Sequence, residues 1–433
     1  MAAASSLPPP ASIPAAASIS RPDEADLRAV IEELADIDRA PASPGEREAA
    51  HLIAGRFQGS GLRVEVEDEP AFGSYAWPVG VAAAAAAAAG VMAGYRPQRT
   101  DAGRRGSRSG SLPGSLRRAA GTLGGALAAA GIADEISLGR QAIRRLISPR
   151  RTTCNVVGYA GDQNAARTLV VMAHHDAAPS GIVFDQRLQR WFAARYPGVV
   201  ERMTENPPLW WPVVAGPALV AIGSGTGSRA LRATGTVMSA IAAAAFADIG
   251  LRGPVPGAND NLSAVAVLVA LARSLSERPT EGLRVILLSA GAEEALQQGA
   301  RAFARRHFPA LPRERTSFLN LDTVGSGRLV LLDGEGPLRM EWYDTGMTEL
   351  VARLADELGI FLHRGLRSRN STDGVVPMRA GYPAATLVSV DGARLLPHYH
   401  LYSDTPQNVD YRCVADAAQL TEAVVRAGGA PLV

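Results

Sequence analysis

The sequence contains no lysine, and all 44 of its basic residues are arginines. Acidic residues number 42, so the formal net charge is only +2 and a general nucleic-acid-binding role is not indicated. The uniform use of arginine suggests a coding bias rather than a functional device. Cysteine is almost absent too. Cys154 and Cys413 cannot form a disulfide framework, and one bridge or two free thiols both stay open.

The first 20 residues lack the basic segment and the continuous apolar core of a signal peptide. They consist mainly of alanine, serine and proline, so we expect residues 1–21 to form a disordered tail. The whole chain of 433 residues is long enough for two or three average domains, or for one large domain with insertions.

Short apolar runs alternate with helical patterns over most of the chain. This alternation predicts an α/β fold with a mixed, largely parallel central sheet that is flanked by helices. Ser43 before Pro44 resembles a helix N-cap followed by proline in the first helical position. Expected strands are residues 62–66, 155–159, 169–173, 283–289, 318–321, 329–332 and 385–390, and expected helices are 24–36, 44–57, 262–275, 294–305, 348–358 and 414–426.

Four further segments are rich in alanine and almost free of charge. They come in two pairs and are each roughly 15 to 18 residues long, somewhat short of the roughly 20 that a spanning helix needs. Gly121-x-x-x-Gly125 within the second segment is a small-residue spacing that allows close helix contact. The alternatives are four buried core helices, an alanine-rich cap domain, or two membrane hairpins. The segments are residues 79–94, 119–133, 209–223 and 233–250.

The sequence around these segments favours membrane hairpins. Trp77, Trp210 and Trp211 lie at segment ends, as in an aromatic belt. Each pair is joined by an arginine-bearing loop, and the positive-inside tendency would place both loops in the cytoplasm and the remaining chain outside. Other arginines on the opposite side weaken this orientation. The loop arginines are Arg96, Arg99, Arg104, Arg105, Arg108, Arg229 and Arg232, and the opposing ones are Arg140, Arg144, Arg145, Arg150 and Arg151.

We therefore expect a multi-pass protein of the cell membrane, with the extracytoplasmic side favoured for the catalytic domain. The predicted α/β domain comprises residues 22–75, 150–205 and 251–433. Inserted hairpin 1 would be residues 76–149, and inserted hairpin 2 would be residues 206–250.

Metal-type ligands follow apolar runs or glycine-containing turns at five places. Two imidazoles with several carboxylates suit zinc, and two such ions bridged by one carboxylate are a known hydrolase arrangement. Asp260 is the natural bridge, whereas Glu293 and Glu294 would point in different directions, one to metal and one free as a base. The five places are His174-x-Asp176, Gly257-Ala258-Asn259-Asp260-Asn261, Glu293-Glu294, Asp322, and His398-Tyr399-His400 with Asp404.

Each residue alone has a structural alternative. A single histidine is more often hydrogen bonded than a ligand, Asp260 could cap the following helix, and Asp322 could be a turn residue. Glu293 and Glu294 could form a solvated first helical turn. It is much less probable that all five places carry such residues by chance than that one of them does.

This order of motifs resembles the zinc aminopeptidases of metallopeptidase family 28. The resemblance covers about residues 24–70, 152–181 and 253–426, and includes Asn370-Ser371-Thr372-Asp373-Gly374 and Gly381-Tyr382-Pro383-Ala384. It implies two Zn²⁺ ions. His174 and Asp322 would hold one, Glu294 and His400 the other, and Asp260 would bridge them.

The resemblance also implies roles for the remaining polar residues. Glu293 would be the general base, and Asp176 would accept a hydrogen bond from the ring of His174 and so fix its tautomer. Tyr399 could stabilise the oxyanion. The spacing to Asp404 favours His400 over His398, and His175 is expected to be a bystander.

The predicted function is therefore hydrolysis that releases N-terminal amino acids from peptides, at a membrane. The oligomeric state stays open. A glutaminyl-cyclase-like acyltransferase with one zinc is the alternative enzyme, and a non-catalytic membrane binding module is the alternative from another class. The chain departs from the family between Asp176 and Asp260, where hairpin 2 and the aromatic-rich residues 184–191 are expected to cap or narrow the site.

Overall fold

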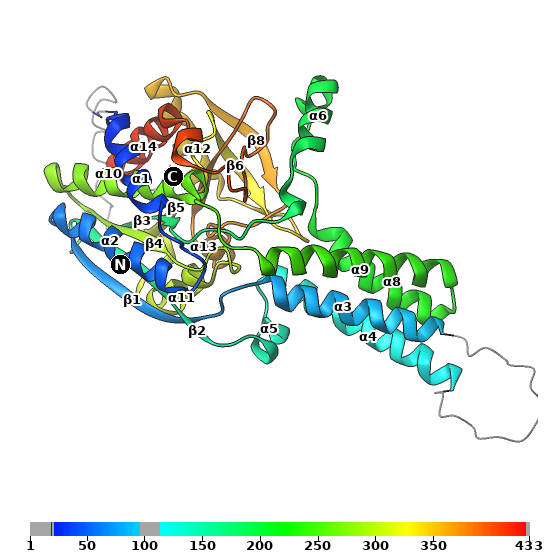
Figure 1. The fold of residues 1–433 in the computed structure, drawn as a ribbon. Helices are drawn as coiled ribbons and strands as arrows, with labels where there is room; N and C mark the ends of the chain where they lie inside the picture. Colours follow the sequence, from blue (N-terminus) through cyan, green and yellow to red (C-terminus); the bar gives the residue numbers. More distant parts are fainter. Residues whose placement is uncertain (1–18, 20, 96–112, 430–433) are drawn as a thin grey trace, which may run out of the picture.

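A computed structural model describes residues 19, 21–95 and 113–429, and among these a single mixed sheet forms the centre of the molecule (Figure 1). The strand order is β1-β2-β4-β3-β5-β9-β6-β7, with β8 paired to β6. The strands are β1 (Arg63–Ala71), β2 (Arg151–Gly161), β3 (Arg167–His174), β4 (Leu283–Ala290), β5 (Thr316–Leu321), β6 (Arg328–Glu335), β7 (Glu341–Trp342), β8 (Leu362–Ser368) and β9 (Ala384–Val390).

The four central strands β4, β3, β5 and β9 run parallel to one another. The outer pairs β1–β2, β2–β4, β6–β9 and β6–β7 are antiparallel. Because parallel strands end at the same edge, the residues that follow β3, β4 and β5 meet at one place.

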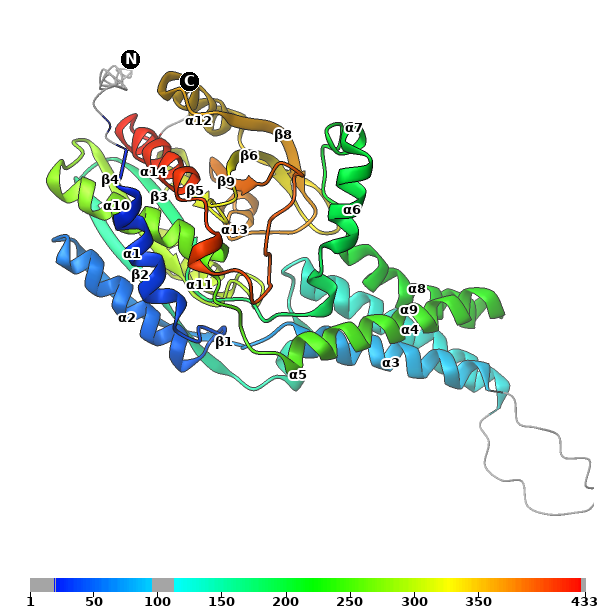
Figure 2. The ribbon, with the colours of Figure 1, turned by 45° about the horizontal axis from the view of Figure 1, so that its top comes forward.

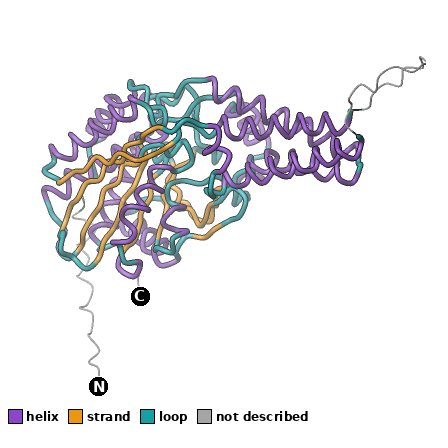
Figure 3. Tube along the Cα trace, turned by 90° about the horizontal axis from the view of Figure 1, so that it is seen from below, coloured by secondary structure: helices purple, strands orange, loops and turns teal. Residues whose placement is uncertain are grey.

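Helices pack against both faces of the sheet, and Figure 3 shows them around the strands. One buried apolar cluster joins the sheet to α1, α2, α10, α12 and α14, and a second joins the other face to α11 and α13. Burial on both faces explains why the central strands are continuous apolar runs rather than alternating ones. The helices are α1 (Glu24–Ala35), α2 (Pro44–Gly59), α10 (Ser263–Glu277), α11 (Gln298–His307), α12 (Thr345–Leu358), α13 (Val375–Arg379) and α14 (Tyr411–Arg426).

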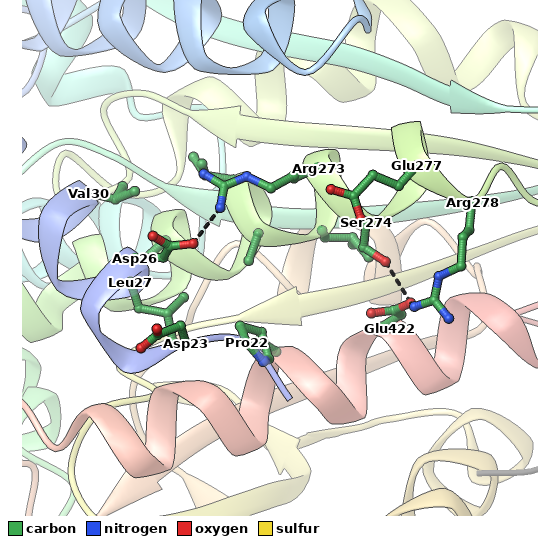
Figure 4. A pocket seen from close by; sticks show the side chains of 15 residues that line it. Pro22, Asp23, Asp26, Leu27, Val30, Arg273, Ser274, Glu277, Arg278 and Glu422 are labelled. Atoms are coloured by element: carbon green, nitrogen blue, oxygen red, sulfur yellow. Dashed lines mark hydrogen bonds and ion pairs between the residues drawn. The ribbon is translucent and has the colours of Figure 1, made fainter. Parts of the chain in front are cut away.

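Polar contacts fasten α1, α10 and α14 to each other around a small cavity of about 130 Å³ (Figure 4). Arg273 pairs with Asp26, and the Ser274 hydroxyl donates to Glu422 at 2.6 Å. The residues that line this cavity belong to α1 and the residues before it, to α10 and Arg278, and to α14, and none of them is a candidate site residue.

Four apolar helices form a bundle that projects from the α/β part (Figures 1 and 2). Helix α3 packs against α4 and α9, and α8 packs against the same two helices. The short α5 (Ala142–Ile147) follows α4, and α6 (Arg187–Arg195) with α7 (Pro197–Val200) precedes α8. The bundle helices are α3 (Ala76–Gly94), α4 (Gly114–Ile136), α8 (Trp210–Thr226) and α9 (Arg229–Leu251).

Small residues make this close packing of the bundle helices sterically feasible. A Cβ on Gly121 would come within 2.5 Å of the Ala93 side chain, and one on Gly125 within 2.6 Å of the Ala221 backbone. The close contact expected from the Gly121-x-x-x-Gly125 spacing is therefore present, between α4 and its neighbours α3 and α8.

Apolar side chains cover the outer surface of the bundle and also fill its interior. Large exposed side chains include Val91, Leu123, Leu127, Val237 and Ile241. Two helices, Ala76–Gly94 and Arg229–Leu251, are long and apolar enough to cross a membrane by length and composition.

Most expected elements are present with longer bounds, and Ser43 caps α2 by accepting from the backbone N–H of Glu46 at 3.2 Å. The expected helix 294–305 is wrong at its start, because residues 293–297 form a turn with positive φ at Leu296 and Gln297, and α11 begins at Gln298. The two cysteines are free and buried. Nearly all of the expected tail and the arginines between residues 96 and 108 lie outside the described residues.

Candidate metal centre

Asp260 lies between two histidines that come from distant parts of the chain. Its Oδ1 atom is 3.4 Å from Nε2 of His174, and its Oδ2 atom is 3.3 Å from Nε2 of His400. The peptide bond from Asp260 to Asn261 is cis. Asp260 belongs to the short turn η3 (Ala258–Leu262), whereas α10 starts at Ser263 with Leu262 as its cap. The alternative that Asp260 caps this helix is therefore wrong.

The adjacent acids Glu293 and Glu294 follow β4 and point to different histidines. Oε2 of Glu294 lies 3.4 Å from Nε2 of His400, and Oε2 of Glu293 lies 4.0 Å from Nε2 of His174. Asp322, which follows β5, has Oδ2 at 3.9 Å from the same atom of His174. The structure thus brings together His174, Asp260, Glu293, Glu294, Asp322 and His400 at the carboxyl edge of the central strands.

The spacing within this group fits zinc. Two atoms bound tetrahedrally to one zinc ion at about 2.0–2.1 Å lie about 3.3–3.4 Å apart. The three closest His–carboxylate separations are 3.4, 3.3 and 3.4 Å. Among the described residues, Asp260 Oδ2 and His400 Nε2 are buried without a hydrogen-bond partner, which a bound cation would remedy. Buried His174, Asp260 and Glu294 form a group able to hold a metal ion.

Burial and mutual charge perturb the acids and histidines strongly. Burial raises the pKa of Asp322 to about 7, and it raises the pKa of Glu293 well above the ordinary glutamate value. Burial lowers the pKa of His400, but Glu294 and Asp260 outweigh it and raise this pKa to about 10. A cluster with this much buried negative charge is best satisfied by cations.

Asp176 holds the glutamate turn against the strand that ends in His174. Its Oδ1 and Oδ2 atoms accept the backbone N–H groups of Glu293 and Glu294, both at 3.0 Å. Nδ1 of His174 lies 3.4 Å from Oδ1 of Asp176 and 3.2 Å from the backbone oxygen of Asp176. Asp176 therefore also aligns the backbone of both glutamates, in addition to the orientation of His174 that the sequence predicts.

Three further buried residues fix the loops of the site, and the sequence reasoning assigned none of these roles. Asp404 accepts the backbone N–H groups of Asn259 and Asp260 at 2.8 and 3.0 Å. Arg39 donates to the carbonyls of His175 and Pro256 at 2.9 and 2.7 Å.

Glu46 is the third of these residues. It accepts from the backbone N–H of Ala292 at 2.9 Å and from the Thr153 hydroxyl at 2.6 Å. Only Ser43-Pro44-Gly45-Glu46, with its capping pattern, offered a local sequence signal. Asp373 is buried as well, and neither of its carboxylate oxygens has a hydrogen-bond partner among the described residues.

His398 and His175 do not face the group of carboxylates and have other partners. His398 bonds the Ser403 hydroxyl through Nδ1 at 2.8 Å, and buried His175 bonds the Ser289 hydroxyl at 3.0 Å. Tyr399 stacks on His400 with ring centroids 3.8 Å apart. Phe184, from the aromatic-rich stretch, meets His400 edge-on at 4.4 Å and so narrows the site.

The fold is shared with proteins of known structure. The chain shares its fold with an aminopeptidase from Aneurinibacillus sp. strain AM-1 (18% identity, 95% of each chain, TM-score 0.52). A Zn-dependent exopeptidase from Parabacteroides distasonis is similar (12% identity, 94% and 99% of the chains, TM-score 0.53), as is the glutaminyl cyclase of Bacteroides thetaiotaomicron (13% identity, 94% and 99%, TM-score 0.53). No curated protein matches the sequence.

A family model matches part of the second half of the chain. Residues 239–425 match the model of peptidase family M28, which confirms the resemblance drawn from the motifs. The matched segment contains Asp260, Glu293, Glu294, Asp322 and His400. His174 and Asp176 precede it, and their place beside the same ligands comes from the sheet topology.

Proposed function

We propose that this protein is a zinc metallopeptidase that removes N-terminal amino acids from peptides. The observation that carries the proposal is the Asp260 carboxylate, which presents one oxygen to His174 and the other to His400. Two Zn²⁺ ions per chain fit this arrangement. One would be held by His174, Asp322 and Asp260, and the other by His400, Glu294 and Asp260.

Bound zinc would polarise the scissile carbonyl and lower the pKa of a water molecule. Glu293 is placed to take the proton of that water, because its carboxylate faces His174 and accepts from the Gln297 side-chain amide at 2.6 Å. Once it has taken that proton, Glu293 can deliver it to the leaving amine, so that one side chain acts first as base and then as acid. Tyr399 lies beside His400 and would donate to the carbonyl oxygen.

Metal analysis and one substitution test this function. We expect two zinc ions per purified chain, and we expect Glu293→Gln to lower kcat by roughly 10²–10⁴-fold at unchanged zinc content. Release of free amino acids from peptide arylamides is the readout. A chain without bound zinc, or a Glu293→Gln variant with full activity, would refute the proposal.

Glutaminyl cyclisation is the second candidate, because a bacterial glutaminyl cyclase shares the fold. In that case one zinc per chain and release of ammonia from a peptide that begins with glutamine are expected. The carboxylate shared by two histidines favours the two-zinc peptidase instead.

We further propose that the four-helix bundle anchors the protein in the cell membrane as a multi-pass segment. The exposed apolar side chains of the bundle and the two helices long enough to span support this placement. The arginines in the connection between α3 and α4 and at the start of α9 favour the cytoplasm for the far end and the extracytoplasmic side for the catalytic part. Labelling of a Phe361→Cys variant by a membrane-impermeant maleimide in intact cells tests this orientation, since Phe361 is exposed on the catalytic part.

A further inference from the structure

A large apolar cavity connects the candidate zinc site to the helical bundle. It measures about 400 Å³. Glu293, Glu294, His400 and Tyr399 line its catalytic end, together with Asn370 and Ser371.

The remainder of the cavity wall comes from the bundle. Trp210 and Val213 of α8 face the space, as do Met238, Ile241 and Phe246 of α9. Trp210 stacks on Phe246 with centroids 5.8 Å apart, and Tyr75 meets both rings edge-on. This aromatic group forms a fixed surface, because each ring is held by two others.

The cavity is too large for one side chain. An apolar cavity of about 150 Å³ accommodates a benzene ring. The volume of about 400 Å³ therefore suffices for at least two large apolar side chains. Apart from Glu293, Glu294 and His400 at the catalytic end, its described lining residues are uncharged, so a charged side chain against the bundle wall would be desolvated without a counter-ion.

The cavity also has an apolar rim. Leu209 and Ile241 line it and are 54% and 65% exposed, respectively. The entrance thus lies along α8 and α9, and an apolar peptide would meet hydrophobic surface before it reaches Glu293.

We infer that the bundle supplies the substrate-binding wall, and that the protein acts on peptides whose first two residues are both large and apolar. This inference rests on the proposed peptidase function. It assigns to α8 and α9 the recognition of side chains on both sides of the scissile bond, and to the strand ends only the chemistry.

A substrate series on the zinc-loaded, full-length protein tests the inference. The probes are the tripeptides Leu-Phe-Ser, Leu-Ala-Ser and Ala-Ala-Ser, each followed by release of its first amino acid. One methylene in an apolar pocket is worth roughly 10-fold or more. We therefore expect kcat/KM to rise at least about 10-fold at each step, from Ala-Ala-Ser to Leu-Ala-Ser to Leu-Phe-Ser.

A matched pair of substitutions assigns the effect to the bundle. Ile241 lines the cavity, whereas Val237 lies one turn earlier on α9, is similarly exposed and does not line it. We expect Ile241→Asn to raise KM for Leu-Phe-Ser about 10-fold and to raise KM for Ala-Ala-Ser much less. Val237→Asn is expected to leave both values at the wild-type level.

Binding without turnover provides an independent readout. Leu-Phe-Ser methylated on its first amide nitrogen should bind the wild type in calorimetry with a negative heat-capacity change, and bind Ile241→Asn more weakly. Equal turnover of all three tripeptides, or equal effects of the two substitutions, would overturn the inference. Absence of turnover on every peptide would instead refute the proposed function.

Discussion

Asp404 acts on the zinc site through the backbone, since its carboxylate accepts the N–H groups of Asn259 and Asp260. An asparagine in its place could accept only one of them and would turn its amide hydrogens toward the other. We expect Asp404→Asn to weaken zinc binding by roughly 10–100-fold, the usual effect of losing a partner that orients a ligand. Competition with a chromogenic chelator measures this change.

Asp410 provides the matched control for Asp404→Asn. It also accepts two backbone N–H groups, from Arg412 and Cys413, but at the start of α14. Asp410→Asn should therefore reduce stability by about 1 kcal/mol at most and leave the zinc dissociation constant unchanged. Equal zinc affinities of the two variants would contradict the role given to Asp404.

Glu335 on β6 makes stability depend on pH. Burial raises its pKa to about 8, although Tyr343 and Thr372 donate to its carboxylate. Because the folded-state pKa lies above the unfolded value, the folded protein binds more protons between about pH 4.5 and pH 8. The free energy of unfolding should thus fall as pH rises through this window, by up to about 1.4 kcal/mol per pH unit from this group.

Urea unfolding of the zinc-free protein at pH 5 to 8 tests this dependence. In Glu335→Gln the group cannot ionise, so the decline of stability with pH should be shallower than in the wild type. An identical decline in both proteins would show that other groups determine it.

At the scale of elements, a buried ion pair links the bundle to the catalytic turn. Arg144 of α5 and Glu135 of α4 are both fully buried, and their side chains approach within 3.0 Å. Arg144 also donates to the backbone oxygen of Ala295, the residue after Glu294. The guanidinium group of Arg144 thus connects Glu135 of α4 to the turn that carries Glu293 and Glu294.

Two variants separate the stability role of this pair from its positioning role. Arg144→Met leaves Glu135 buried without its partner and should destabilise the protein by about 3–5 kcal/mol. The double variant Arg144→Met/Glu135→Met should recover most of that loss. Both variants should show lower kcat at unchanged KM, because neither holds Ala295. Recovery of kcat together with stability in the double variant would refute the positioning role.

The sequence reveals the elements whose pattern is local. Buried β3, β4 and β5 are continuous apolar runs, and the ligands that follow them are polar residues at their ends. The sequence does not predict strand β8, because its residues Leu362–Ser368 are partly exposed, include two arginines and form no apolar run. Asp404 and Arg39 could not be assigned either, since their partners are backbone groups that only the fold brings near.

At the scale of the whole molecule, we expect one acidic side chain on the outer surface of the bundle to weaken the attachment of the protein to the membrane. Leu127 on α4 and Phe361 on the catalytic part are 71% and 72% exposed. A glutamate at the centre of a lipid-facing helix costs about 2–3 kcal/mol or more. Leu127→Glu should therefore lower the fraction of protein in carbonate-washed membranes, and Phe361→Glu should not. Equal fractions for both variants, or a wild type in the soluble fraction, would contradict the membrane anchor.

The chain order of the bundle and the ligands sets a sequence of events during synthesis. All four bundle helices precede Asp260, whereas His400 lies close to the end of the chain. At about 5–20 residues per second, roughly 10–45 s separate the appearance of His174 from that of His400. The four bundle helices are therefore synthesised while the candidate zinc site still lacks four of its five ligands, namely Asp260, Glu294, Asp322 and His400. Insertion of the bundle into a membrane, as proposed above, would therefore precede the formation of the zinc site and the onset of peptidase activity.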